Sequence, residues 1–293
     1  MSDLKNFNAT IMKQNNQEYL TAVLGEKKSS FVNNLTALVS NDAKLQACTP
    51  LSLIYAGIKA TALDLPLDSN LGFAYVIPYK DNSEKDEKGS VIEKTVAQLQ
   101  IGYKGFKQLA IRSGQFRVIN ATDVRDGEVK KRNRLTSEIE FDFIQNDAER
   151  LSKKIIGFVS YFELLNGFSQ TFYMSVEELT QHGLKYSKTF NSNKKWVKDS
   201  SKWVTDFDAM CLKTVTKLNL SKNAPLSVEM QTAIKSDQAV ISEKGEIHVD
   251  NQINSDGNEK ALKIINKAFE QIEDAKEIKE DDNNKTLFEE QNE

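Results

Sequence analysis

Apolar residues recur every three or four positions along the first 65 residues, a spacing that predicts amphipathic helices. One helix is expected to begin at Ser29 or Ser30, either of which is a suitable N-cap, and to run to about residue 40. Thr49 followed by Pro50 predicts a second helix, because proline is favoured at the first helical position. That helix should end near Pro66, since the residue before a proline avoids helical backbone angles. We therefore expect residues 1–65 to form a helical N-terminal region.

The period of the pattern then changes to two. Apolar residues alternate with smaller or polar ones from Leu71 to Tyr79 and again from about Thr95 to Tyr103, with a strongly charged insert at Lys80–Ser90 between them. Two alternating segments around a polar loop predict a long β-hairpin. Pro78 has no N–H for a sheet hydrogen bond, so the first strand is expected at an edge or a bulge.

A short amphipathic helix is predicted directly after the hairpin, from Lys104 to Ser113. At 100° per residue, Phe106 and Leu109 share one side of this helix, while Lys104 and Lys107 share the opposite side. Gly114 follows in the position where helices commonly stop. The pattern predicts one face in the core and one cationic face.

Further strands are predicted beyond this helix. Residues 155–164 form a dense apolar run, and residues 168–174 are expected to pair with it across Asn166-Gly167. This dipeptide is a strong hairpin signal, because both residue types tolerate positive φ. Ser175 and Glu178 have the spacing of a capping box, which predicts the start of another helix.

One long helix is then predicted from about residue 200 to residue 220. Trp203 lies on its apolar stripe and is interpreted as a core residue, and a second stripe carries Lys202, Lys213 and Lys217. Pro225 is expected to open a last short helix. Residues 66–235 are thus expected to form the main folded core.

The charge of the chain is divided unevenly. Residues 236–293 contain sixteen acidic residues and seven lysines, whereas residues 1–235 carry a net charge of +6. This last segment also loses its aromatic content and its periodicity, apart from one amphipathic stretch at 259–275. We expect an acidic, largely disordered tail, and the basic body indicates a partner such as nucleic acid.

Several classes of site lack their sequence signatures. No apolar run approaches the roughly 20 residues of a membrane span, and the N-terminus lacks the layout of a secretory signal, so a cytoplasmic protein is expected. Cys48 and Cys211 have no partner at metal-ligand spacing and are interpreted as reduced core thiols. With only His182 and His248 in the chain, a histidine triad or metal cluster is not expected.

Enzyme motifs are likewise missing from the sequence. It has no Gly-x-x-x-x-Gly-Lys-Ser/Thr loop, no complete dinucleotide fingerprint and no Gly-x-Ser-x-Gly elbow. We therefore expect no cofactor and a binding protein rather than an enzyme. The alternative is a metal-dependent nuclease that uses the alternating carboxylates Glu138, Glu140 and Asp142, although such alternation is more typical of a solvated strand face.

The residues that remain suit a single-stranded nucleic acid, which is bound by cations along the backbone and by aromatic side chains that stack on bases. The cationic candidates lie on predicted helices or strands or in the lysine-rich segment 185–202, and are Lys104, Lys107, Arg112, Arg125, Lys198, Lys202, Lys213 and Lys217. The aromatic candidates are Tyr75, Tyr103 and Trp196.

Several segments, in order and at matching spacing, resemble the RecT family of phage recombinases. They include residues 71–79 (LGFAYVIPY), 98–106 (QLQIGYKGF), 112–115 (RSGQ), 124–128 (VRDGE) and 209–214 (AMCLKT). The resemblance extends from about Ala43 to Ala233. Within it, Lys104, Arg112 and Arg125 match basic positions of the family pattern, and Lys213 and Lys217 match its late basic pair.

The resemblance implies an ATP-independent protein that coats single-stranded DNA and anneals it to a complementary strand in homologous recombination. It also implies assembly into rings or helical filaments and work beside a 5′-to-3′ exonuclease, with a host single-strand-binding protein as a second candidate partner. The implied fold is α+β: an antiparallel sheet with a long β-hairpin, packed by helices, and similar to the Rad52 annealing core. Contacts to phosphate and sugar would leave the bases readable.

Overall fold

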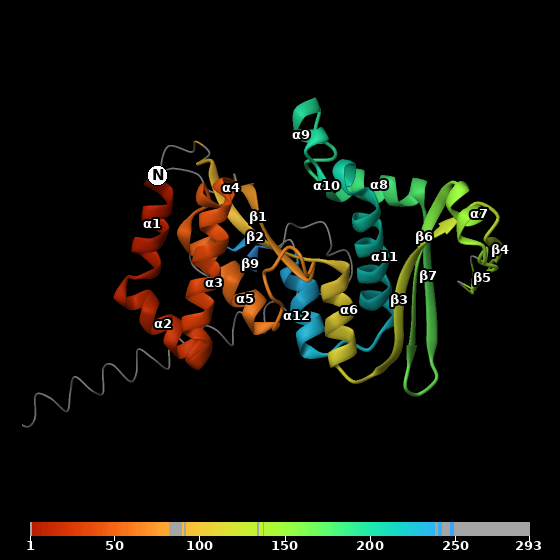
Figure 1. Cartoon of the computed structure of the whole chain (residues 1–293), viewed down its shortest axis with the longest axis horizontal. Helices are drawn as coiled ribbons and strands as arrows, with labels where there is room; N and C mark the ends of the chain where they lie inside the picture. The colour runs from red at the N-terminus through yellow and green to blue at the C-terminus, as the bar shows by residue number, and fades with distance from the viewer. Residues whose placement is uncertain are drawn as a thin grey trace, which may run out of the picture. The chain divides into compact units, whose positions relative to one another are not determined.

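The structure is a computed structural model, and it describes residues 2–81, 90, 92–133, 135–136, 138–237, 240–241 and 247–248. The chain divides into two units, residues 1–248 and 249–293, and the described residues all belong to the first. The second unit, with the amphipathic stretch at 259–275, lies outside the described residues, as does most of the charged insert at 80–90. The first unit mixes helices with antiparallel strands (Figure 1), as the predicted α+β class requires. Its described helices are all too short or too polar to cross a lipid bilayer.

The N-terminal region is helical, as predicted. Its elements are α1 (Ser2–Ile11), α2 (Gln14–Leu24), the 3₁₀ turn η1 (Gly25–Lys27), α3 (Lys28–Asn41), α4 (Ala43–Gln46) and α5 (Pro50–Ala62). Neither Ser29 nor Ser30 caps α3, because η1 leads directly into it at Lys28. Thr49 and Pro50 do begin α5. The backbone N–H of Thr49 donates to the carbonyl of Thr95 at 2.8 Å and so joins α5 to the hairpin.

The predicted long hairpin is present as β1 (Ala74–Asp81) and β2 (Lys94–Ile101). The two strands pair antiparallel as a two-stranded sheet of their own. Pro78 on β1 lies opposite Ala97. Among the described strands β1 pairs only with β2, so the proline occupies an edge strand as expected. Short β8 (Val240–Ile241) lies beside β2 and pairs with β9 (Ile247–His248).

A three-stranded antiparallel sheet in the order β3-β6-β7 forms the second part of the unit (Figure 1). Its strands are β3 (Phe116–Arg125), β6 (Ile155–Leu164) and β7 (Ser169–Ser175). The hairpin at Asn166-Gly167 is confirmed, but only Gly167 has positive φ, at +85°. Leu164 N–H donates to the Phe168 carbonyl at 2.8 Å, which closes a three-residue loop with glycine in the left-handed position.

A small ribbon of β4 (Val129–Arg132) and β5 (Ile139–Phe141) follows β3, and α7 (Asp147–Ser152) comes just before β6. Beyond β7, Ser175 and Glu178 form the predicted capping box of α8 (Val176–Tyr186). The next helix, α9 (Lys195–Asp199), is short.

The long helix predicted from residue 200 to residue 220 is two helices. The chain leaves helical angles at Asp206 (φ −150°, ψ 54°), between α10 (Lys202–Thr205) and α11 (Phe207–Asn223). Lys202 is therefore not on the same helix as Lys213 and Lys217. The last helix of the described residues, α12, spans Val228–Ser236 and is capped by Ser227 rather than opened by Pro225.

Two hydrophobic clusters hold these elements together. The larger one joins the N-terminal helices, the hairpin, α6 (Tyr103–Arg112) and α12. The smaller one packs α8, α10 and α11 against β6 and contains Phe158, Leu179 and Trp203, the last only 6% exposed, as its core interpretation requires. Burial raises the pKa of both thiols, Cys48 and Cys211, to about 12, which agrees with their interpretation as reduced core cysteines.

Candidate nucleic-acid interface

Three of the predicted contact residues come together at the start of α6. Tyr75 on β1 is 39% exposed, Tyr103 is half-buried and Lys104 is exposed. A Cβ placed on Gly72 would lie 3.1 Å from the Tyr75 hydroxyl and 3.5 Å from Cδ of Lys104, so these two side chains are neighbours. Burial raises the pKa of the Tyr75 phenol, and the adjacent Asp206 and Tyr103 raise it further. The junction of β1, α6 and α10 thus presents two phenols and an ammonium together.

The glycines around this junction allow the chain to approach the start of α6 closely. A Cβ on Gly102 would lie 2.3 Å from the carbonyl oxygen of Gly72, and a Cβ on Gly105 would lie 2.2 Å from that of Phe73. The Gly102 N–H donates to the Phe73 carbonyl at 2.9 Å. No larger residue fits at 102 or 105 without moving this segment. The two glycines therefore fix the positions of Tyr103 and Lys104 between them.

The two other predicted cations of α6 differ in their surroundings. Lys107 is half-buried. Arg112 reaches the end of α5, where its guanidinium donates to the carbonyl oxygens of Leu63 and Asp64 and pairs with the Asp64 carboxylate at 3.2 Å. A cation is favoured at the carboxyl end of a helix, where carbonyl groups lack partners. Arg112 therefore joins α6 to α5.

Arg125 at the end of β3 is also engaged within the fold. Its side chain is 13% exposed and pairs with Asp123 at 2.8 Å. Its terminal nitrogen donates to the carbonyl oxygens of Leu151 and Lys153 at 3.1 and 2.9 Å. These bonds hold the end of α7 against β3, and with the Asp123 pair they engage Nε and one terminal nitrogen of the guanidinium.

Lys213 and Lys217 of α11 converge on one carboxylate, that of Asp237. The Nζ–Oδ distances are 2.9 and 2.6 Å, and the side chains of Lys213, Lys217 and Asp237 are 8%, 13% and 0% exposed. Burial lowers the pKa of Lys213, an effect that Asp237 opposes. Burial would raise the pKa of Asp237, but the two lysines hold it below its usual value. Asp237 follows α12, and nothing in the local sequence links it to α11.

The lysine-rich segment around α9 and α10 presents its side chains to solvent. Lys198 and Lys202 are exposed, and Trp196 is 73% exposed. The Nζ of Lys198 lies 5.5 Å from the centre of the Phe190 ring, within cation–π range. An exposed tryptophan flanked by lysines suits a nucleic acid with unpaired bases.

Some cations beside this surface were not among the predicted contact residues. Lys185 of α8 and Lys222 of α11 are exposed, and together with Lys217 they act electrostatically on His182. Burial, followed by these three ammonium groups, lowers the pKa of His182 to about 4. Lys188 donates to the Tyr79 hydroxyl at 2.6 Å, which links the segment after α8 to the hairpin. The lysine density of residues 185–202 was the sequence signal for Lys185 and Lys188, and it did not include Lys222.

The predicted residues thus fall into two groups. The accessible group contains Tyr75, Tyr103, Lys104, Lys107, Lys198 and Lys202, and the engaged group contains Arg112, Arg125, Lys213 and Lys217. Each member of the engaged group is bonded to partners within the fold.

The carboxylates of the nuclease alternative lie on or beside β5. Glu138, Glu140 and Asp142 are exposed, and Asp142 pairs with Lys130 at 3.4 Å. Within the described ranges, no group of three His, Cys, Asp or Glu side chains is arranged to hold a metal ion.

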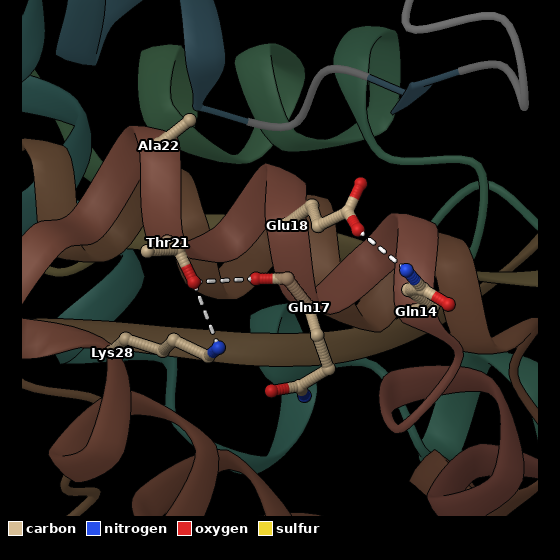
Figure 2. A pocket seen from close by; sticks show the side chains of 6 residues that line it. All are labelled: Gln14, Gln17, Glu18, Thr21, Ala22 and Lys28. Carbon is tan, nitrogen blue, oxygen red and sulfur yellow. Dashed lines mark hydrogen bonds between the residues drawn. The ribbon is translucent and has the colours of Figure 1, made fainter.

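A pocket on the N-terminal helices lies outside both groups. Figure 2 shows its lining, which is Gln14, Gln17, Glu18, Thr21, Ala22 and Lys28. Thr21 donates to the Gln17 carbonyl at 2.7 Å and accepts from Lys28 at 2.8 Å, so these polar groups satisfy one another. The lining includes none of the predicted contact residues.

Comparison with known proteins decides the family. The model of the RecT family matches residues 29–252, about three quarters of the chain. This chain belongs to the RecT family. The resemblance seen in the sequence motifs is thereby confirmed, and the match includes α6, α11 and Asp237.

Two curated relatives are similar to this RecT-family chain. The uncharacterized protein YqaK of Bacillus subtilis (strain 168) is 40% identical over 212 residues, which cover 72% of this chain and 65% of YqaK. Protein RecT of Escherichia coli (strain K12) is 28% identical over 197 residues, which cover 65% of this chain and 64% of RecT. The chain thus spans just under two thirds of the length of each.

Proposed function

We propose that this protein binds single-stranded DNA and anneals it to a complementary strand without nucleotide hydrolysis, in phage-type homologous recombination. The observation that carries the proposal is membership of the RecT family over residues 29–252. The sequence agrees, because it has no loop of the kind that cradles ATP phosphates. In this proposal the protein is not an enzyme, since pairing two strands forms no covalent bond.

The accessible group and the exposed Trp196 supply the contacts in this proposal. Lys104, Lys198 and Lys202 would bind phosphates, because exposed ammonium groups on ordered elements neutralise backbone charge independently of sequence. Trp196, with Tyr75 and Tyr103, would stack on unpaired bases. Annealing needs bases that remain readable, so we expect most of the affinity to come from phosphate contacts and to fall steeply with salt.

The assembly and its partners are part of the same proposal. We expect rings or helical filaments in which neighbouring subunits extend the strand path, built on a core similar to that of Rad52. The expected partners are a 5′-to-3′ exonuclease and a host single-strand-binding protein, recruited by the acidic residues beyond 236. The expected location is the cytoplasm of the bacterial host. Deletion of residues 249–293 should leave annealing intact and abolish recruitment.

An annealing assay with fluorophore- and quencher-labelled complementary oligonucleotides tests the function. We expect pairing to be faster than spontaneous pairing with EDTA present and nucleotide absent. No acceleration over a range of protein concentrations would refute the proposal. The nuclease alternative is tested by incubating the labelled strands with magnesium and measuring their length, because a nuclease shortens them.

A matched pair of double variants tests the assigned surface. Lys104→Gln with Lys202→Gln removes two accessible cations of the proposed surface. Lys5→Gln with Lys13→Gln removes two exposed cations of the N-terminal helical region, one on α1 and one just before α2. We expect only the first pair to weaken DNA binding beyond the general effect of lost charge.

A further inference from the structure

The carboxylate of Asp237 accepts hydrogen bonds from three donors of other elements. One carboxylate oxygen, Oδ1, accepts from the Nζ of Lys213 and from the backbone N–H of Ile101, both at 2.9 Å. The other oxygen, Oδ2, accepts from the Nζ of Lys217 at 2.6 Å. The ligands come from β2 and α11, and the carboxylate comes from the residue that follows α12.

The charge of this cluster is unbalanced. Two ammonium groups face one carboxylate, and all three side chains are largely removed from water. A buried charge is costly unless it is paired, so the two ammonium groups require an anion at this place. The groups beside Lys217 do not supply the missing negative charge. They are the neutral His182 and the exposed Lys185 and Lys222.

A phosphodiester matches what Asp237 presents. Like a carboxylate, it carries one negative charge and two equivalent oxygens, and it accepts hydrogen bonds from lysine and from backbone N–H groups. We propose that Lys213, Lys217 and the Ile101 N–H form a phosphodiester site of the DNA-binding surface, which Asp237 closes until a strand displaces it. This inference rests on the proposed function and adds a self-inhibitory contact to it.

The position of Asp237 in the chain allows such an exchange. Its backbone N–H still donates to the Ala233 carbonyl at 2.9 Å, so it ends α12, and β8 begins three residues later beside β2. Displacement would therefore move the short segment after α12, while α11 and β2 keep their places in the core. Binding would be coupled to release of that segment, and each would favour the other to the same extent.

Hydrogen exchange of the full-length wild-type protein, with and without oligo(dT), tests the exchange of partners directly. We expect peptides that cover Asp237 and β8 to exchange faster in the complex. The amide of Ile101 should stay protected, because a phosphate oxygen replaces the carboxylate as its acceptor. Unchanged or increased protection of the Asp237 peptide with DNA bound would overturn the inference but leave the proposed function standing. Failure of the wild type to bind oligo(dT) would instead remove the function on which the inference rests.

Substitution gives an independent measure. Asp237→Asn should lower the Kd for oligo(dT) by about tenfold, within the roughly 5- to 150-fold range that coupled sites commonly span. Adding Lys217→Gln should reverse this gain. Asp147→Asn, which removes an exposed carboxylate from α7, controls for net charge and should change Kd less than twofold, on the order of a weak surface effect. Unchanged or weaker binding by a folded Asp237→Asn protein would show that Asp237 only supports the fold. If this variant does not fold, the exchange measurement on the wild type decides.

Discussion

The carbonyl oxygen of Phe73 lies against the α-carbon of Gly105, so closely that a Cβ on residue 105 would be 2.2 Å from it. This contact seats the end of the loop before β1 on the first turn of α6, directly beside Lys104. Replacing Gly105 with alanine should therefore destabilise the protein by roughly 1–3 kcal/mol or more through overpacking. Helix propensity alone predicts the opposite sign, a gain of about 1 kcal/mol. Urea unfolding measures the difference.

Gly25→Ala provides the control for this substitution. Gly25 has positive φ, at +52°, but a Cβ there would meet no atom within 4 Å. Its cost should come from the backbone alone, about 1–3 kcal/mol, because φ +52° with ψ −125° is a combination that residues other than glycine rarely adopt. If Gly105→Ala were as stable as the wild type, the close contact with Phe73 would not be a constraint on the fold.

Lys104 and Arg112 lie on the same helix, but neutralising them should affect different properties, DNA binding for Lys104 and stability for Arg112. Lys104 is exposed, whereas Arg112 holds the carbonyl groups at the end of α5. We expect Lys104→Gln to reduce the slope of log Kobs against log salt by about 0.7, the value for one single-strand phosphate. Arg112→Gln should leave this slope unchanged and lower the free energy of unfolding by about 1–2 kcal/mol.

Salt titrations of oligonucleotide binding and urea unfolding, carried out on both variants, separate the two effects. A reduced slope for Arg112→Gln at unchanged stability would place its guanidinium on the DNA instead.

The two tryptophans offer a similar contrast. Trp196 is 73% exposed and Trp203 is 6% exposed. Trp196→Ala should cost about 1–3 kcal/mol of DNA-binding free energy, the usual value for one stacked base, with little change in stability. Trp203→Ala should instead cost about 3–5 kcal/mol of folding free energy, because it leaves a cavity in the core. Quenching of tryptophan fluorescence by oligo(dT) should be lost in the Trp196→Ala variant. Quenching that persists in Trp196→Ala would contradict the stacking assignment.

The elements that could be predicted from the sequence are those with local signals. The α6 helix has an apolar face, a cationic face and a glycine at its end within twelve residues, and the capping box of α8 spans only Ser175 to Glu178. The break at Asp206 was missed because Trp203 and Phe207 continue the apolar stripe across it, so the periodicity of the pattern is kept while the helix is not.

The candidate site was harder to predict because its decisive contacts are distant in sequence. Helical spacing places Lys213 and Lys217 on one side of α11, but it does not indicate which group faces them. Their partner Asp237 follows 24 and 20 residues later and belongs to the segment after α12. Likewise, Arg112 pairs with residues near 64, so its basic character in the motif did not reveal its role at the end of α5.

Lys59 on α5 provides a pH-dependent prediction that is independent of DNA. Its Nζ is buried and has no hydrogen-bond partner in the described part of the chain. Burial lowers the pKa of Lys59 from 10.5 to about 8. Between these values the unfolded chain binds a proton that the folded chain does not, so stability should rise with pH from about 8 to about 10.5 and should not depend on this group below pH 8.

Lys59→Met should therefore stabilise the protein at pH 7 by up to roughly 3 kcal/mol, the free energy that corresponds to such a pKa difference. This advantage over the wild type should shrink as the pH is raised toward 10.5, because the wild-type lysine then loses its charge in both states. Urea unfolding at pH 7, 9 and 10 measures the gap. Lys5→Met, at an exposed lysine of α1, should show no such dependence. A gap that stays constant with pH would mean that the buried charge of Lys59 is paired in solution and costs the fold nothing.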